Sequence, residues 1–94
     1  MYLSYQQVTV NNQIKTVNEL VVPAKATHCE IQASTNNVRY TMDGTTNPST
    51  TAGMALLTTH EPKLFTIDDI RRIKFTRESS DGYLNLHYLA GRDI

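Results

Sequence analysis

Apolar and polar residues alternate with a period of two along most of the chain. In residues 27–33 the side chains of Cys29, Ile31 and Ala33 share one face, and in residues 83–89 the even-numbered positions are apolar in the same way. Such alternation is typical of strands that rest one face on a core. Extended segments are expected over residues 5–10, 14–22, 27–33, 38–42, 54–57, 63–67, 73–77 and 83–89. Some are short, and together they predict about seven strands.

Two turn sequences predict β-hairpins. Asn36-Asn37 separates two alternating segments, and asparagine tolerates the positive φ of a tight turn, so we expect a hairpin from Thr27 to Met42. Ser79-Ser80-Asp81-Gly82 is the strongest hairpin turn in the chain and precedes the last alternating segment. Residues 45–52 contain no large apolar side chain and are expected to form a surface loop.

Helical periodicity is nearly absent. No segment carries three turns of apolar residues at helical spacing, and one helical turn is expected, capped by Thr66, Asp68 or Asp69 and running to about Arg72. Many short strands separated by turn residues favour an all-β fold. The sequence therefore predicts a small antiparallel β-sandwich or flattened barrel with at most one short helical turn.

The first twenty residues match the alternating pattern least well. We expect residues 1–20 to form an N-terminal arm or an edge strand, which a neighbouring subunit could complete, and residues 21–94 to form a single β-sandwich domain. Tyr2 and Tyr5 lie in this segment, and tyrosine buries area while keeping a polar group. Anchoring on another subunit and a role within the chain are both open for these two residues.

Composition and charge narrow the classes of partner. The 94 residues suffice for one domain, and 9 basic and 9 acidic residues give a formal net charge of zero. Non-specific nucleic-acid binding and a polybasic membrane patch both need excess positive charge, so neither partner is expected. No apolar run approaches the length of a membrane span, and the N-terminus lacks the pattern of a signal peptide. Synthesis and folding in a cytoplasm are therefore expected.

Residues that could carry chemistry are few. Cys29 is the single cysteine, so an intrachain disulfide is excluded, and its phase predicts a buried thiol. His28, His60 and His87 do not stand at metal-ligand spacings. Nucleotide-binding and nucleophile-elbow motifs are missing from the sequence. We therefore expect no enzyme activity, no metal and no cofactor.

Basic and aromatic residues supply the candidate contacts. A modest cluster of basic residues predicts either an electrostatic contact with a partner's carboxylates or a solvated strand face. The cluster consists of Arg39, Arg71, Arg72, Lys74 and Arg77. Tyr40 and Tyr88 fall on core-facing phases. Phe75 shares a phase with Ile73 and is expected in the core. The candidate partner contacts are Tyr2, Tyr5, Arg39, Arg71 and Arg72.

Two segments carry a resemblance to known proteins. The segment 38–48, VRYTMDGTTNP, resembles the strand and loop of immunoglobulin-like β-sandwich modules attached to carbohydrate enzymes. Together with VPAKATHCEIQ at residues 22–32, IKFTR at 73–77 and LNLHY at 84–88, it is similar to short β-rich structural proteins of tailed bacteriophages. Proteins of that kind include capsid decoration proteins, also called cement proteins, and head-fibre pieces.

The resemblance implies a bacteriophage virion structural protein. It implies a capsid decoration or cement protein that binds the assembled shell through the major capsid protein or another virion protein, with a homotrimer as the natural form and the virion as its location. The alternative is a head-fibre or tail adhesin that binds carbohydrate. That alternative needs an exposed aromatic platform, which a chain without tryptophan and with Tyr40 and Tyr88 in core phases does not offer in the obvious places.

Overall fold

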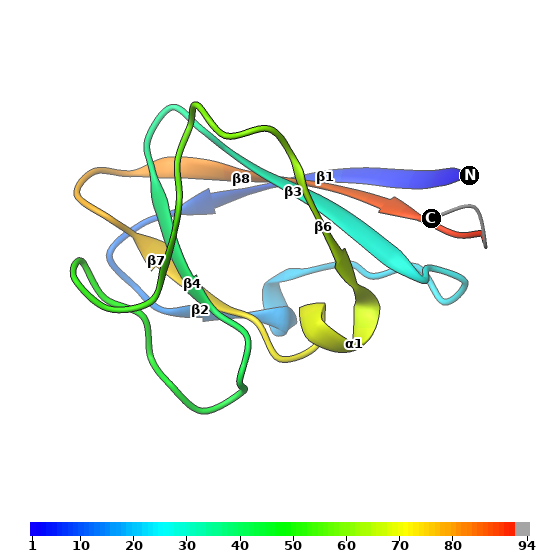
Figure 1. Cartoon of the computed structure of the whole chain (residues 1–94), viewed down its shortest axis with the longest axis horizontal. Coiled ribbons are helices and arrows are strands. Elements are labelled where there is room, and N and C mark those ends of the chain that lie inside the picture. Colours follow the sequence, from blue (N-terminus) through cyan, green and yellow to red (C-terminus); the bar gives the residue numbers. More distant parts are fainter. Residues whose placement is uncertain (92–94) are drawn as a thin grey trace.

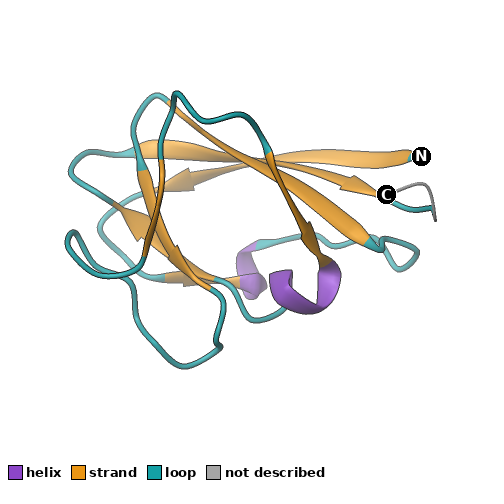
Figure 2. Cartoon of the chain, in the orientation of Figure 1, coloured by secondary structure: helices purple, strands orange, loops and turns teal. Residues whose placement is uncertain are grey.

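The computed structural model describes residues 1–91 and folds into two antiparallel sheets of four strands each (Figure 1). The strands are β1 (Tyr2–Val10), β2 (Lys15–Thr16), β3 (His28–Ser34), β4 (Val38–Thr41), β5 (Met54–Leu56), β6 (Lys63–Thr66), β7 (Lys74–Arg77) and β8 (Gly82–Leu89). The helical pieces are a 3₁₀ turn, η1 (Val17–Glu19), and one α-helical turn, α1 (Ile67–Ile70). The predicted all-β sandwich is confirmed, with loops joining the strands (Figure 2).

The two sheets enclose one core. Strands of the first sheet are ordered β1-β8-β3-β6 and those of the second β2-β7-β4-β5. Buried side chains from both sheets form one apolar cluster, which includes Val10, Ile31 and Leu86 from the first sheet and Leu56 and Phe75 from the second. Burial of these apolar surfaces is the main force that holds the sheets together.

Both expected hairpins are wrong, because the chain crosses between the sheets at each of these turns. β3 pairs with β6 and β8, whereas β4 pairs with β5 and β7. β7 and β8 are likewise in different sheets. The turn after β3 contains Thr35, a non-glycine residue with a φ of 71°. A crossing turn sets the apolar faces of successive strands against each other across the core, whereas a hairpin would set them side by side.

The second extended segment is much shorter than the predicted 14–22. Only Lys15–Thr16 is a strand, and Thr16 then caps η1 by accepting a hydrogen bond from the backbone N–H of Asn18 at 3.2 Å. Residues 1–91 thus contain two short helical pieces where one was expected. The second piece, α1, is capped by Thr66, whose hydroxyl accepts from the N–H of Asp69 at 3.3 Å.

The predicted core positions are confirmed. Cys29 and Tyr88 are completely buried, Phe75 is buried beside Ile73, and Tyr40 is 6% exposed. Inward and outward positions alternate regularly in β3 and β8, so the outward residues of both strands are also fixed.

The N-terminal segment supplies an edge strand of the first sheet. β1 pairs with β8 of its own chain from Tyr2 to Val10, so the two strands lie side by side in Figure 1. Val8 and Val10 are buried in the core, and the other residues of β1 are exposed or half-buried.

Candidate functional site

The outer face of the first sheet gathers most of the exposed aromatic residues. Its side chains come from the outward positions of β1, β8, β3 and β6. Three tyrosines and a leucine on this face are among the large apolar side chains that remain exposed. We call this surface the tyrosine face and define it by Tyr2, Tyr5, Gln7, Glu30, Gln32, Leu64, Tyr83, Asn85 and His87.

A β-bulge brings Tyr2 and Tyr5 to the same face. Residues three apart in a regular strand point to opposite faces. The register between β1 and β8 shifts between Tyr2 and Ser4, so that Leu3 is an extra residue on β1. An extra residue reverses the side-chain phase, and both tyrosines therefore point outward, with exposures of 57% and 59%.

The two tyrosines pack around His87 of β8. The rings of Tyr2 and His87 are stacked with centroids 4.1 Å apart, and the ring of Tyr5 meets His87 edge-on at 6.1 Å. The Tyr2 hydroxyl donates to Oε1 of Glu30 on β3 at 2.6 Å. This hydrogen bond and the negative charge of Glu30 raise the pKa of Tyr2 above its ordinary value.

Asn85 of β8 is the centre of the polar network. Its Oδ1 accepts from the Tyr5 hydroxyl at 2.7 Å and from Nε2 of Gln7 at 2.9 Å, and its Nδ2 donates to the Ser34 hydroxyl at 3.1 Å. These bonds connect β1, β8 and β3 across the outer surface. They hold the Tyr5 ring in one position, which lowers the entropy that the ring would lose on meeting a partner.

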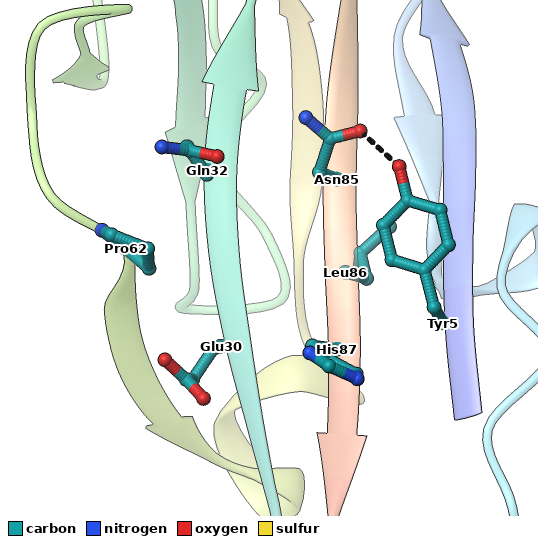
Figure 3. A pocket seen from close by; sticks show the side chains of 7 residues that line it. All are labelled: Tyr5, Glu30, Gln32, Pro62, Asn85, Leu86 and His87. Carbon is teal, nitrogen blue, oxygen red and sulfur yellow. Dashed lines mark hydrogen bonds between the residues drawn. The ribbon is translucent and has the colours of Figure 1, made fainter. Parts of the chain in front are cut away.

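A shallow pocket of about 120 Å³ lies beside the Tyr5 ring. Figure 3 looks onto the sheet and shows the ring nearly face on, with Pro62 on the opposite side of the pocket. Gln32 and Glu30 of β3 line it together with three residues of β8, Asn85, Leu86 and His87. The pocket is smaller than the several hundred cubic ångströms typical of sites that enclose a small-molecule ligand.

The chemistry of the tyrosine face favours binding over catalysis. Glu30 is the one carboxylate among the residues that define this face, and it accepts a hydrogen bond from the Tyr2 hydroxyl. The remaining groups are phenols, amides, an imidazole and an apolar side chain, all at a surface open to water. Phenol rings contribute contact area and amides contribute hydrogen bonds, which is the combination that recognition surfaces use.

The other predicted contacts lie elsewhere. Arg39 on β4 forms an ion pair with Glu78 at 2.8 Å and donates to the Gly53 carbonyl at 3.2 Å, so its guanidinium is used within the chain. The hydrogen bonds from Asn37 and from Arg39 lower the pKa of Glu78. Arg71 and Arg72 follow α1 and are exposed, with Arg72 beside Gly44.

The three histidines lie on the neighbouring strands β3 and β8 and in the loop between β5 and β6. His28 and His87 occupy outward positions of β3 and β8, and Nδ1 of His60 accepts from the N–H of Leu57 at 3.2 Å. Within residues 1–91, no three or more His, Cys, Asp or Glu side chains are grouped so as to bind a metal ion. The helices in this part of the chain are too short and too polar to cross a membrane.

Sequence reasoning identified Tyr2 and Tyr5 but missed the rest of the tyrosine face. The alternation in residues 27–33 and 83–89 already placed Glu30, Asn85 and His87 on outward positions. What it lacked was the pairing of β1 with β8 and the bulge at Leu3, which bring these positions together. A comparison with known proteins finds no matching family model, no matching curated protein and no matching solved structure.

Proposed function

We propose that this protein is a structural component of a bacteriophage virion, a decoration protein that binds the assembled capsid shell and stabilises it. The observation that supports the proposal is the tyrosine face, a broad, open and nearly uncharged surface on a small rigid sandwich. The resemblance of residues 22–32, 38–48, 73–77 and 84–88 to phage structural proteins is the basis for proposing the major capsid protein or another virion protein as the partner.

The composition of the tyrosine face supports a protein partner. Protein interfaces are enriched in tyrosine and depleted in lysine at their centres. Tyr2, Tyr5 and Tyr83 lie on this face, and its defining set contains no lysine. Leu64 is 48% exposed and adds an apolar anchor. A surface of this kind loses little on desolvation, because few charges have to be stripped of water.

The binding mechanism is one of selective attachment. A protein that binds the closed shell and not its separate subunits adds its binding free energy to the stability of the shell. Many copies on a symmetric lattice multiply a modest contact. The hydrogen bonds from Tyr5 to Asn85 and from Tyr2 to Glu30 restrain these two side chains before contact, and each copy therefore loses less side-chain freedom on binding.

The decisive experiment uses particles of the phage that encodes the chain. Mass spectrometry of purified particles should detect the protein. Particles stripped of it should rebind the purified protein and regain a higher temperature of disruption. Absence from purified particles, or rebinding without any change in that temperature, would contradict the proposal.

Paired variants locate the contact. Tyr5→Ala and Leu64→Ala, which truncate exposed side chains of the tyrosine face, should weaken rebinding at least about tenfold each, as expected of anchor residues. Met54→Ala is the matched control, because Met54 is 62% exposed on β5 of the second sheet. Equal loss from all three variants would argue against the tyrosine face as the contact.

A second candidate function is a head-fibre or tail adhesin that binds carbohydrate. The observation that favours it is the Tyr5 ring, which lies flat along the sheet beside a pocket bordered by Gln32 and Glu30 (Figure 3). Sugar rings stack on such aromatic surfaces while amides and carboxylates bind their hydroxyls. Binding of oligosaccharides by the isolated protein, abolished by Tyr5→Ala and retained by Tyr83→Ala, would support this function over shell decoration.

A further inference from the structure

The free edge of β1 is unlike the other sheet edges of the molecule. β2, β5 and β6 are also edge strands, but they have two, three and four residues, and β2 and β6 carry Lys15 and Lys63. Short length and lysine are two of the means by which proteins keep edges from pairing with other chains. β1 has nine residues, YLSYQQVTV, without charge, proline or glycine.

The hydrogen-bond pattern of β8 shows which groups of β1 are free. Ala90 bonds toward β1: its N–H donates to the Met1 carbonyl at 2.8 Å, and the Met1 amino group donates to the Ala90 carbonyl at 2.6 Å. Leu89 bonds toward the β3 side of β8, because its carbonyl accepts a hydrogen bond from the N–H of Thr27 at 2.9 Å. Residues of an antiparallel strand alternate in this manner between their two neighbours.

The alternation leaves three residues of β1 with unused backbone groups. In the register of β1 with β8, the even-numbered residues from Ser4 to Val10 bond to β8. Tyr5, Gln7 and Thr9 therefore direct their N–H and C=O groups away from the sheet. Among residues 1–91, no other strand pairs with this edge of β1. The β-bulge at Leu3 lies outside this stretch, which is regular from Ser4 onward.

We propose that the partner of this edge is β1 of a second copy of the chain, paired antiparallel across a two-fold axis at Gln7. Gln7 then faces Gln7 of the second copy, and Tyr5 faces Thr9. Each facing pair exchanges two backbone hydrogen bonds. The two first sheets become one continuous sheet, and the two tyrosine faces join into one surface.

Charge and pattern favour a second copy as the partner. A self-paired strand sets each side chain near its own kind, and like charges in such a place are destabilising. β1 has none, and the formal net charge of the chain is zero. Two-fold pairing also preserves the inward and outward phases, so that Val8 stays in the core of each copy and Gln7 stays outside.

Two-fold pairing predicts a closed dimer, because the same edge of both copies forms the contact and no free edge of β1 is left for a third copy. The trimer expected from the phage resemblance would need β1 to pair with a different edge of the next copy. The other edge of the first sheet is β6, which has four residues and begins with Lys63 directly after Pro62. The dimer does not depend on a role in a virion, and its test uses the isolated protein.

Amide hydrogen exchange followed by NMR at several protein concentrations tests the pairing residue by residue. The amides of Gln6 and Val8 should be protected at every concentration, because they bond to β8. Those of Tyr5, Gln7 and Thr9 should be exposed in dilute protein and become protected as sedimentation velocity shows the dimer forming. A monomer at all concentrations, a trimer, or a dimer without protection of these three amides would overturn the proposal.

Substitutions at Gln7 provide a second and independent test. Gln7→Pro removes the N–H from the free edge and should raise the dimer dissociation constant about ten- to a hundredfold, because two hydrogen bonds are lost across the axis. Gln7→Lys and Gln7→Glu should each be monomeric, and an equimolar mixture of the two should form a mixed dimer through opposite charges.

The control is Gln32→Lys, the same change on the outer face of the central strand β3. It should leave the dimer unchanged. Circular dichroism verifies that each variant is folded, and if Gln7→Pro fails to fold, the lysine and glutamate variants still decide. A dimer that persists in Gln7→Lys, or one that Gln32→Lys disrupts equally, would refute pairing through β1.

Discussion

The ring of Tyr2 lies against the ring of His87, with an angle of 24° between their planes. These residues are near opposite ends of the sequence and meet because β1 pairs with β8. The stack also needs the β-bulge at Leu3, which turns Tyr2 to the outer side of the sheet. It therefore reports on the pairing at the beginning of β1.

The Tyr2–His87 stack should contribute measurable coupling. We predict that Tyr2→Ala and His87→Ala are coupled by about 0.5–1 kcal/mol in a double-mutant cycle of unfolding free energies from urea denaturation. Tyr2→Phe is the control, because it keeps the ring and loses the hydrogen bond to Glu30. Coupling indistinguishable from zero would show that the rings touch without stabilising the sheet.

The side chain of Gln6 should contribute more to the unfolding free energy than that of its exposed neighbour Gln7. Oε1 of Gln6 accepts from the Tyr88 hydroxyl at 3.0 Å and from the Val21 N–H at 2.9 Å, and its Nε2 donates to the Glu19 carbonyl at 2.9 Å. Gln6→Ala leaves the hydroxyl of the completely buried Tyr88 without this partner, so we predict a loss of about 1–3 kcal/mol in unfolding free energy.

Gln7→Ala is the matched comparison for Gln6→Ala. The Gln7 amide makes one exposed hydrogen bond, to Asn85, so the loss should stay within about 0.5 kcal/mol in dilute, monomeric protein. Chemical denaturation measures both variants under the same conditions. If Gln7→Ala lowered the unfolding free energy as much as Gln6→Ala, the hydrogen bonds of Gln6 to Tyr88, Glu19 and Val21 would not be the reason for the loss.

The sequence was sufficient for the class of fold and the orientation of side chains. Period-two alternation placed Cys29, Phe75 and Tyr88 in the core, and the structure confirms all three. Alternation fixes only the phase of a strand, however, and carries no information on its neighbour. The assumption that strands joined by a tight turn pair with each other therefore placed β3 with β4, which belong to different sheets.

Gly82 illustrates the same limit. The dipeptide Asp81-Gly82 suggested a hairpin turn that needs the conformational freedom of glycine. In the structure Gly82 begins β8, and a Cβ there would lie 3.0 Å from both the backbone N and the backbone O of Asn36. Glycine is needed for the close approach of a segment that is distant in sequence, and such proximity is not encoded in local patterns.

The tyrosine face was predictable only in part. Tyr2 and Tyr5 were expected to contact a partner. An aromatic platform for sugars was not expected, because Tyr40 and Tyr88 fall on core-facing phases. The bulge at Leu3 reverses the phase of Tyr2 without any glycine, proline or charge to mark it. The position of Arg39 was equally hidden, because its ion-pair partner Glu78 follows β7, a strand that is distant in sequence and pairs with β4.

The thiol of Cys29 should be inert in the folded protein. The side chain is completely buried, and burial raises the pKa of the Cys29 thiol to about 12. Alkylation requires the thiolate, so we predict no modification by iodoacetamide at pH 8.5 in native protein and rapid modification in urea. Mass spectrometry across a urea series should follow global unfolding. Modification well below the unfolding midpoint would reveal local opening of β3.

Asp43 should make stability depend on acid. Its carboxylate accepts hydrogen bonds from the Thr46 hydroxyl and from the N–H groups of Thr46 and Thr45, and these lower the pKa of Asp43 to about 2 from an ordinary 3.8. A carboxyl group whose pKa is lower in the folded than in the unfolded protein stabilises the fold at pH values above its ordinary pKa. This stabilisation is lost as the pH falls from about 4 toward 2. Carboxyl-carbon NMR should record the low midpoint directly.

The matched variants for the acid response are Asp43→Asn and Glu78→Gln. Asp43→Asn should show a shallower fall in unfolding free energy between pH 4 and pH 2 than the unaltered protein. The pKa of Glu78 is also lowered, so Glu78→Gln should remove a separate part of the same fall. An Asp43 midpoint near 3.8, together with an unchanged slope in Asp43→Asn, would contradict the hydrogen bonds of this loop.

The position of β8 has a consequence for biosynthesis. Within residues 1–91, β8 is the strand that comes last in the sequence, yet it lies inside the first sheet between β1 and β3. A ribosome that has released residues 1–81 has produced both neighbours but not the strand that joins them. The first sheet can therefore assemble only after Gly82–Leu89 have left the ribosome, and a product that stops before Gly82 would present two unsatisfied strands to the proteases and chaperones of the cell.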